Sequence, residues 1–193
     1  MYRFTQPIPL HMKLWQKNQT THDKIDRSTV GKDRVYALHL AAYDCEASIA
    51  HAQMLAQVGL LSPEEAEQLT QVLEGLKNEA EKGNFVIESE FEDMHSKIEF
   101  VLTEKLGDLG KKIHTARSRN DQVLVALHLY FKKEIETLKA LTKTFFDLLM
   151  NLAEQHKAHL MPGYTHFQVA MPSSFGLWFS AYAESLIDDM ILL

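Results

Sequence analysis

Apolar residues recur every three or four positions along most of this 193-residue chain, which is the spacing that places them on one face of an α-helix. The clearest stretch begins at Ser62, where a capping serine, a proline at the first helical position and early glutamates precede the apolar positions. The pattern predicts five helices, over residues 34–58, 62–83, 92–106, 120–160 and 172–193. We therefore expect an all-α fold.

The fourth predicted helix is unusually long. At 1.5 Å per residue it would extend roughly 50–60 Å, and helices of that length usually belong to bundles. A loop with glycines, residues 107–120, precedes it. We expect a domain boundary in this loop. The boundary would separate a small helical N-terminal domain, residues 1–113, from the first and incomplete part of a central helical bundle, residues 114–193.

The remaining segments carry no helical period. Residues 1–30 contain two early prolines and mixed polar positions, which favour an extended arm. Residues 111–120 and 161–172 are predicted to be loops, the second because a proline stands near each of its ends. No segment gives a convincing strand pattern, although residues 84–87 could form a short extended piece.

Composition narrows the functional classes. With 46% hydrophobic residues the chain is expected to be globular, and a formal net charge of −6 argues against nucleic acid or an anionic membrane as a partner. The single cysteine, Cys45, allows no internal disulfide. The first residues do not resemble a secretory leader, and no apolar stretch is long enough to span a bilayer. We expect a cytoplasmic protein.

The first candidate site is the sequence HTARSRNDQ, residues 114–122, which we call segment 114–122. It places a histidine, two arginines and hydroxyl and amide groups just before the long helix. Helix N-termini and guanidinium groups both bind carboxylates. Arg117 or Arg119 could hold an anion, with Ser118 and Asn120 giving direction. The alternative is a helix cap with solvated arginines and one ion pair to Asp121.

The second candidate site lies in the predicted loop 161–172. His166 could take part in proton transfer, because imidazole titrates near neutral pH, and Thr165 could hold a carboxylate oxygen. The alternative is a structural turn in which these side chains satisfy backbone groups.

The other histidines and motifs do not indicate a catalytic or metal site. His95 lies on a predicted helix and is more simply a hydrogen-bonded structural residue. His156 and His159 are one helical turn apart, but no neighbouring cysteine or carboxylate completes a metal site. The sequence contains no glycine-rich phosphate loop and no serine-hydrolase motif. We therefore expect neither a metal nor an organic cofactor.

Four stretches, in this order, resemble argininosuccinate lyases, members of the fumarase/aspartase superfamily. The stretches are THDKIDRSTVGKDR, EDMHSKIE, KIHTARSRNDQ and MPGYTHFQVAMP. HTARSRNDQ and PGYTHFQ are the specific ones. The resemblance implies a helical homotetramer with active sites shared between subunits. It also implies a β-elimination that splits argininosuccinate into L-arginine and fumarate, in arginine biosynthesis.

The resemblance also assigns residues. It implies that His166 is the catalytic histidine. It implies that the substrate is bound by Thr29, Ser118, Arg119, Asn120 and Thr165. Asp33 and His95 are weaker assignments near the site.

The sequence departs from the family in two residues, in a missing loop and in length. Ala116 stands where the family commonly has glycine, and Thr29 where it commonly has serine. The family's flexible loop with a catalytic serine does not occur in this sequence, and family chains are more than twice as long. We therefore expect a truncated N-terminal piece of the enzyme that is inactive alone.

Two alternatives stay open at this point. The first is a lyase for another succinyl adduct such as adenylosuccinate, because the superfamily shares the fumarate-releasing half of the reaction. The second is a non-catalytic helical interaction module or a crystallin-like paralogue.

Overall fold

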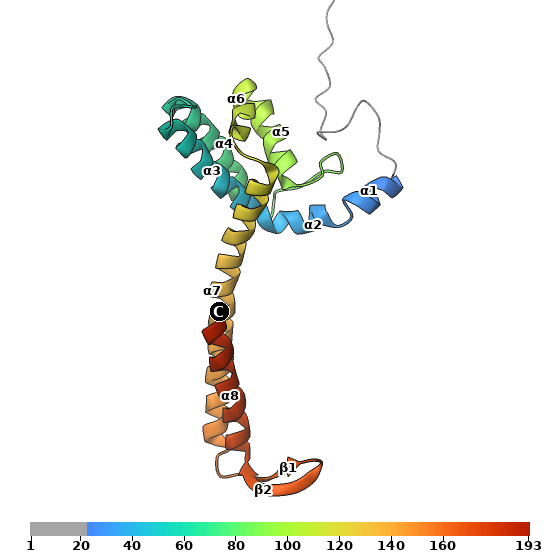
Figure 1. Ribbon diagram of the computed structural model, residues 1–193, viewed down its shortest axis with the longest axis vertical. Helices are drawn as coiled ribbons and strands as arrows, with labels where there is room; N and C mark the ends of the chain where they lie inside the picture. The colour runs from blue at the N-terminus through green and yellow to red at the C-terminus, as the bar shows by residue number, and fades with distance from the viewer. Residues whose placement is uncertain (1–22) are drawn as a thin grey trace, which may run out of the picture. The chain divides into compact units, whose positions relative to one another are not determined.

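The computed structural model describes residues 23–193, drawn in colour in Figure 1. Most of the expected extended arm, residues 1–22, lies outside the described residues. The end of that arm is not extended, because residues from Asp23 to Thr29 form a helix.

The described chain is mostly helical, which confirms the expected fold class. In chain order its elements are α1 (Asp23–Thr29), α2 (Asp33–Ala37), the 3₁₀ helix η1 (Leu38–Leu40), α3 (Ala41–Gln57), α4 (Pro63–Glu81), α5 (Met94–Leu106), α6 (Asp108–Lys111), the 3₁₀ helix η2 (Lys112–His114), α7 (Arg119–Gln155), β1 (Leu160–Thr165), β2 (Gln168–Ser174) and α8 (Phe175–Leu192).

The predicted helices match these elements to different degrees. α4 and α5 lie within two residues of their predicted ends. The predicted helix over residues 34–58 is divided instead into α2, η1 and α3. α7 ends at Gln155, several residues before the proline that was expected to stop it.

The described residues form two compact units, residues 23–130 and 131–193, and the division falls within α7. We describe each unit by itself. The expected domain boundary between residues 113 and 114 stays a prediction, because a division by compactness alone does not fix where a folding domain ends.

In the first unit the core lies between α3, α4 and α5. Leu55, Leu69, Leu73 and Leu102 are fully buried there. A capping box fixes the start of α4: the hydroxyl of Ser62 accepts from the backbone N–H of Glu65 at 3.1 Å, and the Glu65 carboxylate accepts from the backbone N–H of Ser62 at 3.0 Å. The cap predicted from the sequence is therefore present.

The short helix α6 packs closely against α5. A β-carbon built on Gly110 would lie 2.4 Å from the backbone carbonyl of Leu102. Only glycine permits this approach, which brings the chain back along α5 before α7 begins.

The second unit contains a β-hairpin where a loop was predicted. β1 and β2 pair antiparallel from Leu160 and Ser174 to Thr165 and Gln168, with an irregularity beside Gly163. A β-carbon on Gly163 would lie 2.9 Å from the carbonyl oxygen of Met171. The expectation of no strand is therefore wrong here.

α8 follows the hairpin directly. Ser174 caps it, since its hydroxyl accepts from the backbone N–H of Leu177 at 3.1 Å. The predicted start at residues 172–173 is close to this position. A β-carbon on Gly176 would lie 2.7 Å from Cα of Lys157, so this glycine lets the start of α8 approach the residues after α7.

Three described residues other than glycine have a positive φ. They are Ala116 at 55°, His166 at 48° and Phe167 at 60°. This region is unfavourable for residues with a β-carbon. All three belong to the two segments that the sequence marked as candidate sites.

None of the helices among residues 23–193 combines the length and the apolar composition needed to cross a membrane.

Gly110→Ala should lower the free energy of unfolding by about 2–3 kcal/mol, because the new methyl group collides with backbone that cannot turn aside. Gly75→Ala is the matched control: Gly75 lies within α4 with nothing near the added atom, so this change should raise stability by roughly 1 kcal/mol. Urea unfolding followed by circular dichroism measures both. Equal effects at the two sites would contradict the close approach.

Ala116→Gly should stabilise the chain by roughly 0.5–1 kcal/mol, because glycine adopts a positive φ without steric cost. The control is Ala50→Gly, at an exposed position within α3, which should destabilise by about the same amount. Thermal unfolding of the two variants compares them. A loss of stability in Ala116→Gly would mean that the backbone at this position is not left-handed.

Candidate functional site

Segment 114–122 folds as a cap for α7. The hydroxyl of Ser118 accepts from the backbone N–H of Asp121 at 3.3 Å. In return the Asp121 carboxylate accepts from the backbone N–H of Ser118 at 2.8 Å and from its hydroxyl at 2.9 Å. These bonds lower the pKa of Asp121. The cap was predicted at Asn120 and Asp121, whereas Ser118 is the capping residue and Asn120 is exposed.

Both arginines of this segment contact side chains from other parts of the first unit. Nη1 of Arg117 donates to the hydroxyl of Ser48 on α3 at 3.0 Å. Nη1 of Arg119 lies 3.6 Å from Oε1 of Glu99 and 3.7 Å from Oδ1 of Asp93, both from the α5 region. These distances suit ion pairs and are too long for hydrogen bonds. The helix cap of the alternative interpretation is therefore present, but its arginines are paired with groups of the protein and are not freely solvated.

A buried acid–histidine pair lies on the inner side of these arginines. Asp44 on α3 and His95 on α5 are 0% and 1% exposed. Oδ2 of Asp44 and Nδ1 of His95 are 3.0 Å apart. The two atoms are within hydrogen-bond distance, but the geometry of the contact is not that of a hydrogen bond.

Burial dominates the protonation of Asp44. Loss of solvent raises the pKa of Asp44 to about 7, against the opposing effect of the positive charges of Arg117 and Arg119. Asp93 adds to the rise, and His114 opposes it.

Glu99, which lies at ion-pair distance from Arg119, also belongs to this group. Oε1 of Glu99 lies 2.8 Å from Nε2 of His114. Burial raises the pKa of Glu99, with the charge of His114 acting against the rise and those of Asp44 and Asp93 adding to it. We call the set that shares these interactions the charged cluster; its members are Asp44, Asp93, His95, Glu99, His114, Arg117 and Arg119.

Several buried polar atoms of the charged cluster have no hydrogen-bond partner. Among the described residues, Nε2 of His95, Nε of Arg117 and Nη1 of Arg119 are buried without a hydrogen-bond partner. Buried polar groups are normally paired, and exceptions mark strain, catalysis or binding. The arrangement can therefore receive a ligand that accepts hydrogen bonds from the arginines.

A hollow of about 270 Å³ opens beside the cluster, between α3 and the start of α7. Arg117, His51 and Gln122 line it. Nε2 of His51 lies 3.0 Å from the carbonyl oxygen of Thr115. Burial and the charge of Arg117 lower the pKa of His51.

The other predicted site residues lie elsewhere. Thr29 is the last residue of α1 and Asp33 the first of α2, and both are exposed. Thr165 and His166 are exposed at the tip of the hairpin in the second unit. Of the residues predicted for a site, the charged cluster contains Arg117, Arg119 and His95. The roles of all the predicted residues stay predictions.

The hairpin tip has an unusual composition. His166 and Phe167 are its two central residues, and both have a positive φ. Turns of this kind usually contain asparagine and glycine, because both positions are left-handed. Phe167 is also fully exposed. The tip therefore holds strain that its own contacts do not explain, which is a pattern associated with function.

Sequence reasoning missed the acids of the cluster. Asp44 was overlooked although it occupies an inward position of α3, next to the fully buried Cys45. An ionisable residue on the apolar face of a helix was the available signal. Asp93 and Glu99 gave no such signal, because their roles come from contacts with a distant part of the chain.

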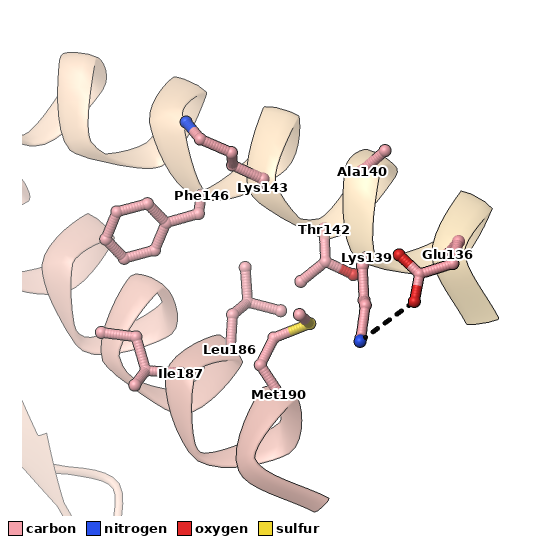
Figure 2. A pocket seen from close by; sticks show the side chains of 9 residues that line it. All are labelled: Glu136, Lys139, Ala140, Thr142, Lys143, Phe146, Leu186, Ile187 and Met190. Atoms are coloured by element: carbon pink, nitrogen blue, oxygen red, sulfur yellow. Dashed lines mark hydrogen bonds and ion pairs between the residues drawn. The ribbon is translucent and has the colours of Figure 1, made fainter. Parts of the chain in front are cut away.

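A second hollow, of about 550 Å³, lies between α7 and α8 in the second unit. Figure 2 shows Phe146 on α7 and Leu186 and Met190 on α8 lining it, with an ion pair between Lys139 and Glu136 at one edge. Its walls are mainly apolar. It suits packing more than catalysis.

Stability should depend on pH through Asp44. An acid whose pKa is raised by folding binds its proton more tightly in the folded state, so this contribution is present below about pH 4 and is lost as the pH rises through about 7. Asp44→Asn should flatten this fall, which urea unfolding across that range would measure. An unchanged slope would contradict the burial of Asp44 as an acid.

The chain is similar in sequence to argininosuccinate lyases over most of its length. The chain is 53% identical over 181 residues to an argininosuccinate lyase of Phocaeicola vulgatus, which covers 94% of this chain and 41% of the relative. It is 51% identical to that of Parabacteroides distasonis with the same coverage, and 42% identical to that of Thermotoga neapolitana, covering 94% and 46%. The chain thus spans less than half the length of these curated relatives.

The fold of the chain resembles that of a solved structure. The crystal structure of beta-carboxy-cis,cis-muconate cycloisomerase from Acinetobacter calcoaceticus matches with a TM-score of 0.63 and 19% identity, covering 78% of this chain and 36% of that one. The expected fold of the fumarase/aspartase type is confirmed. The family model described as "Lyase" matches residues 2–191. The chain therefore belongs to this lyase family.

Proposed function

We propose that this chain carries part of the active site of an argininosuccinate lyase, which splits argininosuccinate into L-arginine and fumarate. The relatives that carry this name share about half of their aligned residues with it. The motif residues Ser118, Arg119, Asn120, Thr165 and His166 match the family's substrate and catalytic positions.

One observation supports the proposal most strongly, and it is the state of Arg119. Its Nη1 is buried, loosely paired with two acids and without a hydrogen bond. A guanidinium held in this way can offer its N–H groups to a carboxylate of the substrate. Ser118 and Asn120 flank it at the helix start, where the backbone favours an anion.

The chemistry explains why such a group is needed. A base removes a proton from the succinyl carbon next to a carboxylate, and negative charge gathers on that carboxylate. The electron pair then forms the double bond of fumarate while the carbon–nitrogen bond breaks and arginine leaves. Donors that bind the developing charge more strongly than the ground state lower the barrier. Arg119 and Asn120 would act in this way.

His166 is proposed to assist proton transfer, with Thr165 holding a carboxylate oxygen. The support is the strained tip of the hairpin, which presents the imidazole to solvent and is stable only if other contacts or a function retain it. Thr29, Asp33 and His95 are proposed to line the same site. We propose no metal and no cofactor for the reaction.

The assembly and the setting are proposals of the same kind. We propose a cytoplasmic homotetramer in arginine biosynthesis, with each active site built from segments of several subunits. The family's serine-containing loop does not occur among the 193 residues. We therefore expect the chain by itself to release no fumarate from argininosuccinate.

A fumarate-release assay tests the proposal. The chain and the chain extended through its reading frame are each given argininosuccinate, and the ultraviolet absorbance of fumarate is followed. Activity in the extended form alone is expected. Release from adenylosuccinate instead would favour another succinyl substrate, and no release from either would favour a non-catalytic helical module.

In the active form, Arg119→Lys should lower kcat/KM roughly 100-fold, because lysine keeps the charge and loses the forked donor geometry. Arg27→Lys, at an exposed position in α1, is the matched control and should leave kcat/KM unchanged. Equal losses in both variants would remove Arg119 from the proposed site.

A further inference from the structure

The side chain of Arg34 joins α2 to the segment between α4 and α5, residues 82–93. Nε of Arg34 donates to the carbonyl oxygen of Phe91 at 2.6 Å, and Nη2 donates to the carbonyl oxygen of Ser89 at 2.9 Å. The segment passes beside α2 in Figure 1. The two nitrogens lie on one edge of the planar guanidinium group, so the arginine holds both carbonyls as a fork.

Segment 82–93 is itself fixed to α5. Phe91 is 1% exposed, and its ring centroid lies 5.3 Å from that of Phe100 on α5. Nζ of Lys97, also on α5, donates to both carboxylate oxygens of Glu88 at 2.6 and 2.8 Å and lies 5.0 Å from the centroid of the Phe91 ring. The segment therefore belongs to the packing of α5, and Arg34 ties α2 to that packing.

Apolar contacts do little to hold α2 in place. Of its five residues, Ala37 is the only one that is buried. Val35 and Tyr36 are 60% and 62% exposed. Hydrogen bonds from a charged donor are roughly twice as strong as neutral ones. Because α2 buries so little apolar surface, its place depends strongly on the fork of Arg34.

The contact joins two residues that lie far apart in the sequence. Asp33, directly before Arg34, is the first residue of α2. Asp93, two residues after Phe91, caps α5 and lies 3.7 Å from Nη1 of Arg119. A short path through the fork therefore connects Asp33 to the acid that contacts Arg119.

We infer that Arg34 is a positioning residue, which fixes Asp33 at the start of α2 relative to Asp93 and Arg119. The inference rests on the proposed function for what these residues bind. Arg119 suits a carboxylate of the substrate, whereas the carboxylate of Asp33 suits one of its cationic groups. Asp33 would be held in place before the substrate arrives, so that ordering it does not weaken binding.

Amide hydrogen exchange without substrate, in the chain extended through its reading frame, tests whether Arg34 holds α2. The backbone N–H groups of Val35 and Tyr36 bond to the carbonyl of Lys32, so their exchange reports the opening of α2. Arg34→Gln should speed this exchange roughly tenfold. Arg34→Lys keeps the charge and loses the fork, so its effect should be smaller.

The matched control is Arg27→Gln, at an exposed position in α1, which should leave the exchange of α2 unchanged. Wild-type exchange in Arg34→Gln would overturn the inference, and so would an equal rise in Arg27→Gln. The amides of Leu69 and Leu73, fully buried on α4, should keep their rates. An equal rise there would show general destabilisation and would also contradict the inference.

Kinetics of the active, extended form test whether Arg34 acts through Asp33. Arg34→Gln and Asp33→Asn should each raise KM for argininosuccinate roughly tenfold, because both weaken substrate binding. Adding Arg34→Gln to Asp33→Asn should raise KM little further, since coupled residues are not additive. Effects that multiply would show that Arg34 does not act through Asp33. A lower kcat at unchanged KM would mean fewer folded enzymes, and the positioning role would be lost.

The inference and the proposed function fail separately, because exchange is measured without substrate. If Arg34→Gln loosens α2 and the extended chain releases no fumarate, the lyase proposal falls and the anchoring of α2 by Arg34 stands. If the extended chain releases fumarate and Arg34→Gln leaves the exchange of α2 unchanged, the inference falls and the lyase proposal stands.

Discussion

Asp44 is an ionisable side chain with no exposure to solvent. The charged groups near it have to compensate for its burial. A buried carboxylate is costly unless positive charge or a proton compensates it. His95 supplies a ring nitrogen at 3.0 Å, and Arg117 and Arg119 supply charge from the start of α7. The need to compensate Asp44 therefore explains why two arginines before a long helix point inward.

Sequence pattern predicted the helices with strong local signals and missed elements that depend on distant contacts. α4 was predicted closely, because Ser62 and its neighbours form a capping box that can be recognised locally. The hairpin was missed for the opposite reason. Its two prolines, the irregularity at Gly163 and the His166–Phe167 turn all depart from ordinary hairpin sequences.

The candidate site was predicted in part. Segment 114–122 showed its arginines directly, and their residue types were enough to suggest an anion site. Which acids hold them could not be read from the sequence, since Glu99 and Asp44 reach the arginines only after α3 and α5 have packed. Ala116 is a different case. In the sequence it was only an alanine where the family commonly has glycine, but its φ of 55° makes it a strained position in the structure.

A crystal structure of the assembled protein with fumarate would test whether the charged cluster forms one side of a site for a dicarboxylate, as we propose. One fumarate carboxylate should lie within hydrogen-bond distance of Arg119, near the N-terminus of α7. Fumarate bound elsewhere, with Arg119 still paired only to Asp93 and Glu99, would contradict it.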